Sequence, residues 1–419
     1  MKQDRLKKTI EEIYGRGAAE AQMKRYAHLT ARFTEEFGAC EPRFFRAPGR
    51  TEIGGNHTDH QHGQVLAAAI DLDIAAVAAP AEDGKIRIAS EGFGRMEIDL
   101  NRPYRNEDKT AEKGTAAALV RGMAEEMNQR GYRIGGFCAY AVSNVPEGSG
   151  LSSSAAFEVL IGVIVSGLFN DGNIPPEEIA HIAQIAENDY YGKPCGLMDQ
   201  MTSATGGLCR IDFRDPAKPA VEKLETDFRE LGYRICITNT HGSHAGHTAD
   251  YAAVQTDLAK AAGVFGKTVL EGVSAEDVIG RAAEIRHAGG DRAFLRALHV
   301  ASENNRVLQE AGALKRQDIA AFLALVRRSG ESSYKLLQNV YVSSVPEKQE
   351  LAVALAVSEA VLKHISEGVC RVHGGGFAGT IQAFVEERCV DQYIAAMDAV
   401  FGEGSCFCIN ISRAGGTEL

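Results

Sequence analysis

The stretch "VPEGSGLSSSAAFEVLIGVIVSGL", from Val145 to Leu168, constrains the fold more than any other part of this 419-residue chain. Two glycines and four serines stand in its first ten residues, and an apolar run follows at once. The apolar run predicts a helix buried in a core, so a flexible polar loop lies at the N-terminal end of that helix. Helix N-termini attract anions, and glycine lets a ligand approach the backbone closely. The stretch therefore predicts a phosphate-binding loop, with a serine-capped helix after a flexible turn as the alternative.

Composition and charge exclude several classes of protein. Hydrophobic residues make up 45% of the chain and charged residues 24%, as in an ordinary globular protein. The formal net charge of −11 disfavours non-specific nucleic-acid binding, which needs clustered Lys and Arg. No apolar run reaches the about 20 residues that cross a bilayer, the N-terminus lacks an apolar signal core, and nine scattered cysteines indicate reduced thiols. We therefore expect a cytoplasmic protein that binds neither nucleic acid nor membrane.

Strand-like and helix-like segments alternate in both halves of the chain, which predicts an α+β protein of two lobes. Helical patterns cover residues 3–37, 114–131 and 175–192, and strand patterns cover residues 65–79, 87–100 and 233–240. The segment "RDPAKPA" contains two prolines and three charges but no large apolar residue, which places a boundary near residue 220. The two lobes would then span residues 1–220 and 221–419.

Two acidic residues stand next to apolar segments. Glu187 borders the apolar stripe of the helix predicted from residue 175, and Asp199 follows 12 residues later inside "GLMDQMTS". A lone acid in such surroundings is usually a core residue with satisfied hydrogen bonds, but it can also be a desolvated general base. Asp199 and a second glycine loop, "HGGGFAG" at 373–379, together favour the phosphate-binding interpretation of the loop before the buried helix.

Six segments in order resemble those of the galactokinases, members of the GHMP family of small-molecule kinases. They cover residues from about 40 to 415 and read "RAPGRTEIGGNHTDHQHGQVLAAAI", "VPEGSGLSSSAAFEV", "AENDYYGKPCGLMDQMTSATGG", "HVASENNRVLQEAGAL", "YVSSVPEKQELAVAL" and "RVHGGGFAG". The resemblance implies a two-lobed GHMP kinase fold with the active site in the cleft between the lobes. It also implies ATP- and Mg²⁺-dependent phosphorylation of a sugar at its anomeric C1 hydroxyl, with galactose giving galactose 1-phosphate.

The resemblance also implies a role for each matched residue. Asp199 would take the proton of the C1 hydroxyl, and Arg50 would pair with Asp199 and stabilise the charge of the transferring phosphoryl group. Ser154 and Glu187 would hold Mg²⁺. The ATP phosphates would contact Gly148, Ser149, Gly150, Leu151, Ser152, Ser153 and Ser154. The sugar would contact Asn56, His57, Thr58, Asp59, Gly196 and, by a looser match, Tyr251, for which a buried core tyrosine is the alternative.

The sugar-binding signature departs from that of the galactokinases. The family reads "GEHTDY" where this chain reads "GNHTDH", so Asn56 replaces a glutamate that contacts the C6 hydroxyl, and His60 replaces a tyrosine. Asn donates as well as accepts hydrogen bonds, and the lost negative charge removes repulsion against an anionic C6 group. A kinase for a C6-altered sugar such as galacturonate is therefore an alternative, while galactose stays the leading substrate.

Functions of other classes also have to be weighed. Galactokinase-like chains can act as sugar sensors without turnover, but the presence of both predicted catalytic residues and both metal ligands favours an enzyme. "HTDH" and "GLMDQ" argue against mevalonate and homoserine kinases. Triple histidines can bind zinc, but no carboxylate pattern accompanies either cluster. We expect the first cluster to shape the sugar pocket, the second to lie on a loop, and the protein to be a monomer; the clusters are His57, His60 and His62, and His241, His244 and His247.

Overall fold

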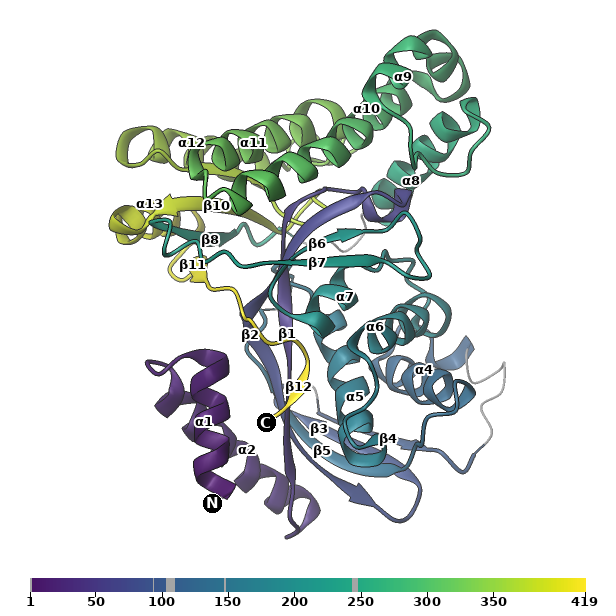
Figure 1. Cartoon of the computed structure of the whole chain (residues 1–419), viewed down its shortest axis with the longest axis vertical. Helices are drawn as coiled ribbons and strands as arrows, with labels where there is room; N and C mark the ends of the chain where they lie inside the picture. The colour runs from purple at the N-terminus through teal and green to yellow at the C-terminus, as the bar shows by residue number, and fades with distance from the viewer. Residues whose placement is uncertain (1, 93, 103–109, 147, 243–247) are drawn as a thin grey trace.

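Two β-sheets organise the chain in the computed structural model, which describes residues 2–92, 94–102, 110–146, 148–242 and 248–419 (Figure 1). The larger sheet has the strand order β12-β1-β2-β5-β3-β4, with β6 on β2 and β7 on β6, and the smaller has the order β11-β8-β10-β9. The larger sheet consists of β1 Arg43–Gly54, β2 Gln64–Ala81, β3 Lys85–Ser90, β4 Gly94–Asp99, β5 Gly136–Ser143, β6 Leu208–Asp212, β7 Ala220–Leu224 and β12 Thr417–Glu418. The smaller consists of β8 Tyr233–Asn239, β9 Val369–Val372, β10 Thr380–Glu386 and β11 Cys406–Ile409.

Helices cover both sheets, so the predicted α+β class is confirmed. The helices of the first half are α1 Lys2–Tyr14, α2 Ala19–Phe37, α4 Ala116–Gln129, α5 Ser153–Asn170, α6 Pro176–Ile185 and α7 Met198–Thr205. Those of the second half are α8 Thr248–Val264, α9 Ala275–Gly280, α10 Ala282–Lys315, α11 Ile319–Ser332, α12 Glu350–Ile365 and α13 Val390–Phe401. Short 3-10 turns lie at Asp59–Gln61 and Glu387–Cys389, and π-helical turns at Ala186–Tyr191 (η2) and Ser333–Leu337.

The long strands β1 and β2 run from the lower part of the molecule, where α1 and α2 lie, into the upper part, where α8 and α10 lie (Figure 1). We call these parts the lower and the upper lobe. Along β2, the side chains of Ile74, Ala76 and Ala78 pack in the cluster that contains α5. The alternate side chains pack against α1 and α2 on the other face; they are Ala75, Val77 and Ala79. Because helices cover both faces, the strand reads as a continuous apolar run instead of an alternating one.

Helix α5 is the buried helix that the opening stretch predicted. Among the described residues it is the one helix whose length and apolar composition would suit a bilayer, but 67% of its residues are buried inside the protein. It packs on β1 and β2 on one side and on α6 and α7 on the other. Its composition is therefore that of a core helix.

Two predicted helices are interrupted, each for a local reason. The helix predicted over 3–37 is two helices, because Gly15 takes a φ of 81° that favours glycine and ends α1. The helix predicted over 175–192 is α-helical only to Ile185 and continues as the π-helical turn η2. This turn ends at Gly192 and leaves Glu187 only 3% exposed. Single π-helical turns of this kind occur frequently at functional sites.

The chain crosses between the sheets more than once. β7 starts at residue 220 and still belongs to the larger sheet, and β12 returns to that sheet from the C-terminal end of the chain. The division into lobes at residues 220 and 221 stays a prediction.

Candidate active site

Two glycine loops from distant parts of the chain meet beside β1. The loop at 148–152 precedes α5, and the loop at 373–379 joins β9 to β10. The hydroxyl of Thr380 donates a hydrogen bond to the carbonyl oxygen of Ser149 at 2.8 Å. The two halves of the chain are therefore in direct contact at the predicted phosphate-binding loop.

The loop at 148–152 leaves the N-terminal end of α5 without a side-chain cap. Gly148 and Gly150 take φ values of 68° and 67°, which glycine adopts without strain. Helix α5 begins at Ser153, and the Ser152 side chain makes no capping hydrogen bond to the described residues of the helix. The alternative of a serine-capped helix is therefore wrong, and the first-turn N–H groups can bind an anion.

Arg50 and Asp199 form a bidentate ion pair next to this loop. Arg50 donates from Nε to Oδ1 of Asp199 and from Nη2 to Oδ2, both at 2.7 Å. Arg50 also donates from Nη1 to the carbonyl oxygen of Gly150. Its backbone N–H donates to the carbonyl oxygen of Leu151 at 3.0 Å. The hydroxyl of Ser152 donates to Oδ2 of Asp199. The ion pair predicted from the sequence is present, and it is fixed to the loop from both partners.

A register shift between β1 and β2 lies directly before Arg50. Pro48 pairs with Asp73 of β2, whereas Arg50 pairs with Ala69, so the register shifts between the two. A Cβ on the intervening Gly49 would lie 2.7 Å from the carbonyl oxygen of Leu151, so only glycine fits. The strand irregularity and the close approach of Gly49 to Leu151 thus lie where Arg50 meets the loop, and such irregularities are common beside active sites.

Glu187 lies in a cluster of buried polar side chains with Glu158 and Gln200, next to the segment that carries Asp199. Its Oε1 accepts a hydrogen bond from Nζ of Lys193 at 2.9 Å, and its Oε2 accepts one from Nε2 of Gln200 at 2.8 Å. The same Gln200 nitrogen lies 3.2 Å from Oε2 of Glu158. Burial, together with the charge of Glu187, raises the pKa of Glu158 well above its ordinary value, which favours the neutral acid.

The donor set around Glu187 fits Mg²⁺. Ser154 lies four residues before Glu158 on α5, so its side chain projects from the same helix face, one turn nearer to the phosphate-binding loop. Among the described residues, no group of three or more His, Cys, Asp or Glu side chains could hold a metal ion alone. One carboxylate and one hydroxyl suit Mg²⁺ when nucleotide phosphates and water supply the other ligands.

The predicted sugar-binding residues lie around the turn that follows β1. A Cβ on Gly196 would lie 1.7 Å from Oδ2 of Asp59, so the backbone before α7 touches this carboxylate. His57 has a φ of 60°, and its Nε2 lies 2.9 Å from the carbonyl oxygen of Gly375. Burial and the neighbouring His60 lower the pKa of His57 to about 3, so its ring is neutral. These contacts join the predicted sugar-binding signature to the segment before α7 and to the glycine loop at 373–379.

Asn56 and Thr58 are fully buried, and their side chains bond to protein groups. Nδ2 of Asn56 donates to Oε1 of Glu52 at 3.0 Å and to the carbonyl oxygen of Gly374 at 2.6 Å. Oδ1 of Asn56 lies 2.9 Å from Nδ2 of Asn339. The hydroxyl of Thr58 lies 2.7 Å and 2.6 Å from two carbonyl oxygens of its own turn. The bonds of Asn56 are therefore committed to the protein, and a sugar contact by either residue stays a prediction.

Tyr251 lies near the start of α8 and faces the second glycine loop. Its hydroxyl donates to the carbonyl oxygen of Gly376 at 2.6 Å, and its ring packs edge-on against Phe377 with centroids 5.1 Å apart. A Cβ on Gly375 would lie 2.6 Å from the Tyr251 ring, so the ring packs directly against the backbone of the loop. The structure thus places Tyr251 against the loop, and its contact with a sugar stays a prediction.

Histidines of both clusters bond to one another or to neighbouring groups. Nδ1 of His57 lies 3.2 Å from Nε2 of His60, but no described third ligand joins them. Nε2 of His241 lies 2.8 Å from the hydroxyl of Ser405. His244 and His247 lie outside the described residues.

Three residues of the site were not predicted from the sequence as functional. Lys193, Gln200 and Glu158 surround the predicted metal ligand, yet none was assigned a role. Glu158 had a detectable signal, because it is a lone acid in the apolar helix α5, four residues after Ser154. Gln200 and Lys193 had none, since their contacts arise only from the folding of the segment between η2 and α7.

Two family descriptions match the chain where this site is built. "GHMP kinases N terminal domain" matches residues 118–207, which include the predicted phosphate-binding loop and Asp199. "Galactokinase galactose-binding signature" matches residues 31–80, which include Arg50 and the turn after β1.

Characterised relatives and solved structures agree with both descriptions. A galactokinase of Actinobacillus pleuropneumoniae serotype 5b is 33% identical over 375 residues, 88% of this chain and 92% of the relative. The human galactokinase is 30% identical over 397 residues, 92% and 95% of the two chains. Lactococcus lactis galactokinase, solved with galactose, superposes with a TM-score of 0.79 at 27% identity, over 94% of this chain and all of that one. A mevalonate kinase shares the fold, with a TM-score of 0.59 at 16% identity over 88% of this chain and 99% of that one. The chain therefore belongs to the galactokinase family and has the GHMP kinase fold.

Proposed function

We propose that this protein transfers the γ-phosphoryl group of ATP to the anomeric C1 hydroxyl of galactose and so forms galactose 1-phosphate. As a member of its family the chain is a phosphotransferase with an alcohol acceptor. The observation that carries the proposal is the bidentate pair of Arg50 and Asp199 at the uncapped end of α5. This arrangement combines a carboxylate base, a cation and an anion-binding helix terminus in one place.

Asp199 acts as the proton acceptor. Its two oxygens accept hydrogen bonds from Arg50 and one from Ser152, which hold the carboxylate in a fixed position beside the loop. As the bond from the sugar oxygen to the γ-phosphorus forms, the proton of the C1 hydroxyl passes to Asp199. The bond from the γ-phosphorus to the bridging oxygen breaks, and ADP leaves. Arg50 lies at the same point and stabilises the charge on the transferring group.

The loop from Gly148 to Ser154 binds the nucleotide phosphates. Its glycines let backbone N–H groups approach phosphate oxygens, and the open end of α5 adds favourable partial charge. Ser154 and Glu187 would hold Mg²⁺, which when bound neutralises charge on the phosphate oxygens. The carboxylate and hydroxyl donors of this chain fit that ion, as described above.

The sugar lies between Asp59, His57 and the backbone at Gly196, with Tyr251 at the second glycine loop. Asp59 is half-buried, and its carboxylate touches the backbone of Gly196, close to the segment that carries Asp199. The carboxylate can therefore accept hydrogen bonds from sugar hydroxyls. Asn56 gives no support to a C6-altered substrate such as galacturonate, because its amide is bonded to Glu52, Gly374 and Asn339. Galactose is therefore the substrate we propose.

We further propose that the protein works as a monomer in the cytoplasm on small molecules alone. All nine cysteines are unpaired, as expected in a reducing compartment. The net charge of −11 is unsuited to a nucleic-acid partner.

A sugar panel tests the proposed function. ADP release would be measured with MgATP and galactose, galacturonate, N-acetylgalactosamine, glucose, arabinose or fucose, and phosphorus NMR would identify the product. We expect turnover of galactose to a 1-phosphate. Turnover of a different sugar alone would move the substrate while keeping the mechanism. Nucleotide binding without turnover on every sugar would instead support a sensor.

A further inference from the structure

Lys193 is bound to the carboxylate that we propose as a metal ligand. Its Nζ lies 2.9 Å from Oε1 of Glu187, the oxygen that Gln200 leaves open. The Glu187 side chain is 4% exposed, whereas that of Lys193 is 62% exposed. The pair therefore consists of a buried anion held in place from inside and a cation that reaches it from solvent.

The lysine can leave this contact when another cation takes its place at Glu187. Lys193 follows Gly192, which has a φ of 86° and ends the π-helical turn. Its side chain is more than half exposed, so the ammonium can return to water when a second cation replaces it at the buried carboxylate. Without such a replacement the charge of Glu187 would stay buried and unpaired, so the lysine is expected to leave only when the metal binds. Glu187 would keep its hydrogen bond from Gln200 and so remain in position. A divalent cation and an ammonium repel each other, so they do not share one carboxylate oxygen comfortably.

The freed ammonium would be close to the reacting groups. Gln200, which shares Glu187 with Lys193, is the residue next to Asp199 on α7. The N-terminal end of α5, where the phosphates are proposed to bind, lies one turn from Glu158, the other partner of Gln200. A lysine side chain is long and flexible and binds phosphate as a point charge.

We propose that Lys193 is a mobile cation of the active site. It neutralises Glu187 in the nucleotide-free protein, and its ammonium binds nucleotide phosphate oxygens once the metal–nucleotide complex has taken over that carboxylate. This inference rests on the proposed function, because it takes Glu187 as a metal ligand. It predicts opposite effects of one substitution on the binding of the metal alone and of the metal–nucleotide complex.

The test measures both affinities in the full-length protein. Binding of Mn²⁺ alone would be followed by electron paramagnetic resonance, and binding of a non-hydrolysable ATP analogue with Mg²⁺ by calorimetry. In Lys193→Met we expect Mn²⁺ to bind about tenfold more tightly, since its competitor is gone, and the nucleotide complex about tenfold more weakly, since a charged contact is lost. Lys193→Arg, which keeps the charge, should retain most of the nucleotide affinity.

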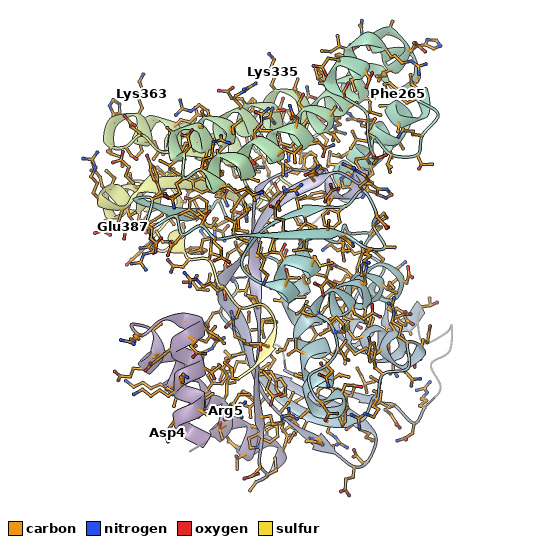
Figure 2. The ribbon with its side chains drawn as sticks, in the orientation of Figure 1. Asp4, Arg5, Phe265, Lys335, Lys363 and Glu387 are labelled. Atoms are coloured by element: carbon orange, nitrogen blue, oxygen red, sulfur yellow. The ribbon has the colours of Figure 1, made fainter. Side chains whose placement is uncertain are left out.

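A matched control removes a lysine charge elsewhere. Lys363 is exposed near the end of α12 on the outer side of the upper lobe (Figure 2), so Lys363→Met should leave both affinities unchanged. Equal weakening of both affinities in Lys193→Met, or no change in either, would overturn the proposal. Lys193→Gln, measured in the same way, guards against a folding defect of one variant. If the unsubstituted protein bound neither Mn²⁺ nor the nucleotide complex, the proposed function would fall and this inference with it.

Discussion

Glu310 on α10 is a buried carboxylate next to β1, and its charge should make stability depend on pH. It is fully buried, and neither of its carboxylate oxygens has a hydrogen-bond partner among the described residues. A Cβ on Gly54 would lie 2.0 Å from its Oε2, so β1 covers it closely. Burial raises the pKa of Glu310 from 4.5 to about 8, although Arg371 and Arg306 act in the opposite direction.

The raised pKa sets both the sign and the size of the effect. The pKa is higher in the folded protein, so the stabilisation from protonated Glu310 is complete below pH 4.5 and is lost as the pH rises to about 8. Each pKa unit corresponds to about 1.4 kcal/mol, so between pH 5 and pH 8 this group lowers the free energy of unfolding by about 3 kcal/mol. The amide in Glu310→Gln cannot titrate, so this variant should not show that loss of unfolding free energy between pH 5 and pH 8.

Urea unfolding followed by circular dichroism from pH 5 to pH 8 measures the effect. The free energy of unfolding of Glu310→Gln, relative to the unsubstituted protein, should rise by about 3 kcal/mol over this range. The comparison cancels the other titrating groups and any constant cost of the buried amide. Glu359→Gln, which changes an exposed residue of α12, should stay parallel to the unsubstituted protein. Parallel curves for Glu310→Gln as well would refute the reasoning.

Three further substitutions test the site and its support. Asp199→Asn should lower turnover about a thousandfold, because the base is lost, while calorimetry finds unchanged nucleotide affinity; a normal rate would contradict the mechanism. Gly150→Ala should weaken nucleotide binding about tenfold, because φ is 67° and the new Cβ would lie 3.2 Å from His373. Gly263→Ala, on open surface, is its control. Asp73→Asn should destabilise the protein by about 3–5 kcal/mol, because Asp73 neutralises the buried Arg46 at 2.5 Å. An unchanged melting temperature would show that this charge is dispensable.

The sequence predicted what depends on local pattern and on matched motifs. The apolar run after Ser154 predicted α5 because a helix covered on all sides needs no polar face. The pairing of Arg50 with Asp199 was predictable because each lies in a matched motif. The serine cap was the wrong alternative, since Ser152 donates to Asp199 instead of to the helix.

The rest depends on segments that meet only in the folded chain. The π-helical turn η2 adds a residue to one turn and so brings Lys193 to Glu187, which an α-helical pattern over 175–192 does not indicate. The hydrogen-bond partners of Asn56 include Gly374 and Asn339, each more than 280 residues away in the sequence. The sugar-binding signature therefore could not predict that the Asn56 amide is already hydrogen-bonded within the protein.

The pairing of β12 with β1 has a consequence for the order of folding during synthesis. Arg43 pairs with Glu418, and the N–H of Leu419 donates to the carbonyl oxygen of Phe44 at 2.9 Å. A ribosome makes β1 before β12, so the edge of β1 that pairs with β12 stays unpaired while the residues between the two strands are being made. An unpaired edge is where strands of other chains attach. The growing chain is thus open to aggregation at this edge of β1 until β12 has been made and has paired with it.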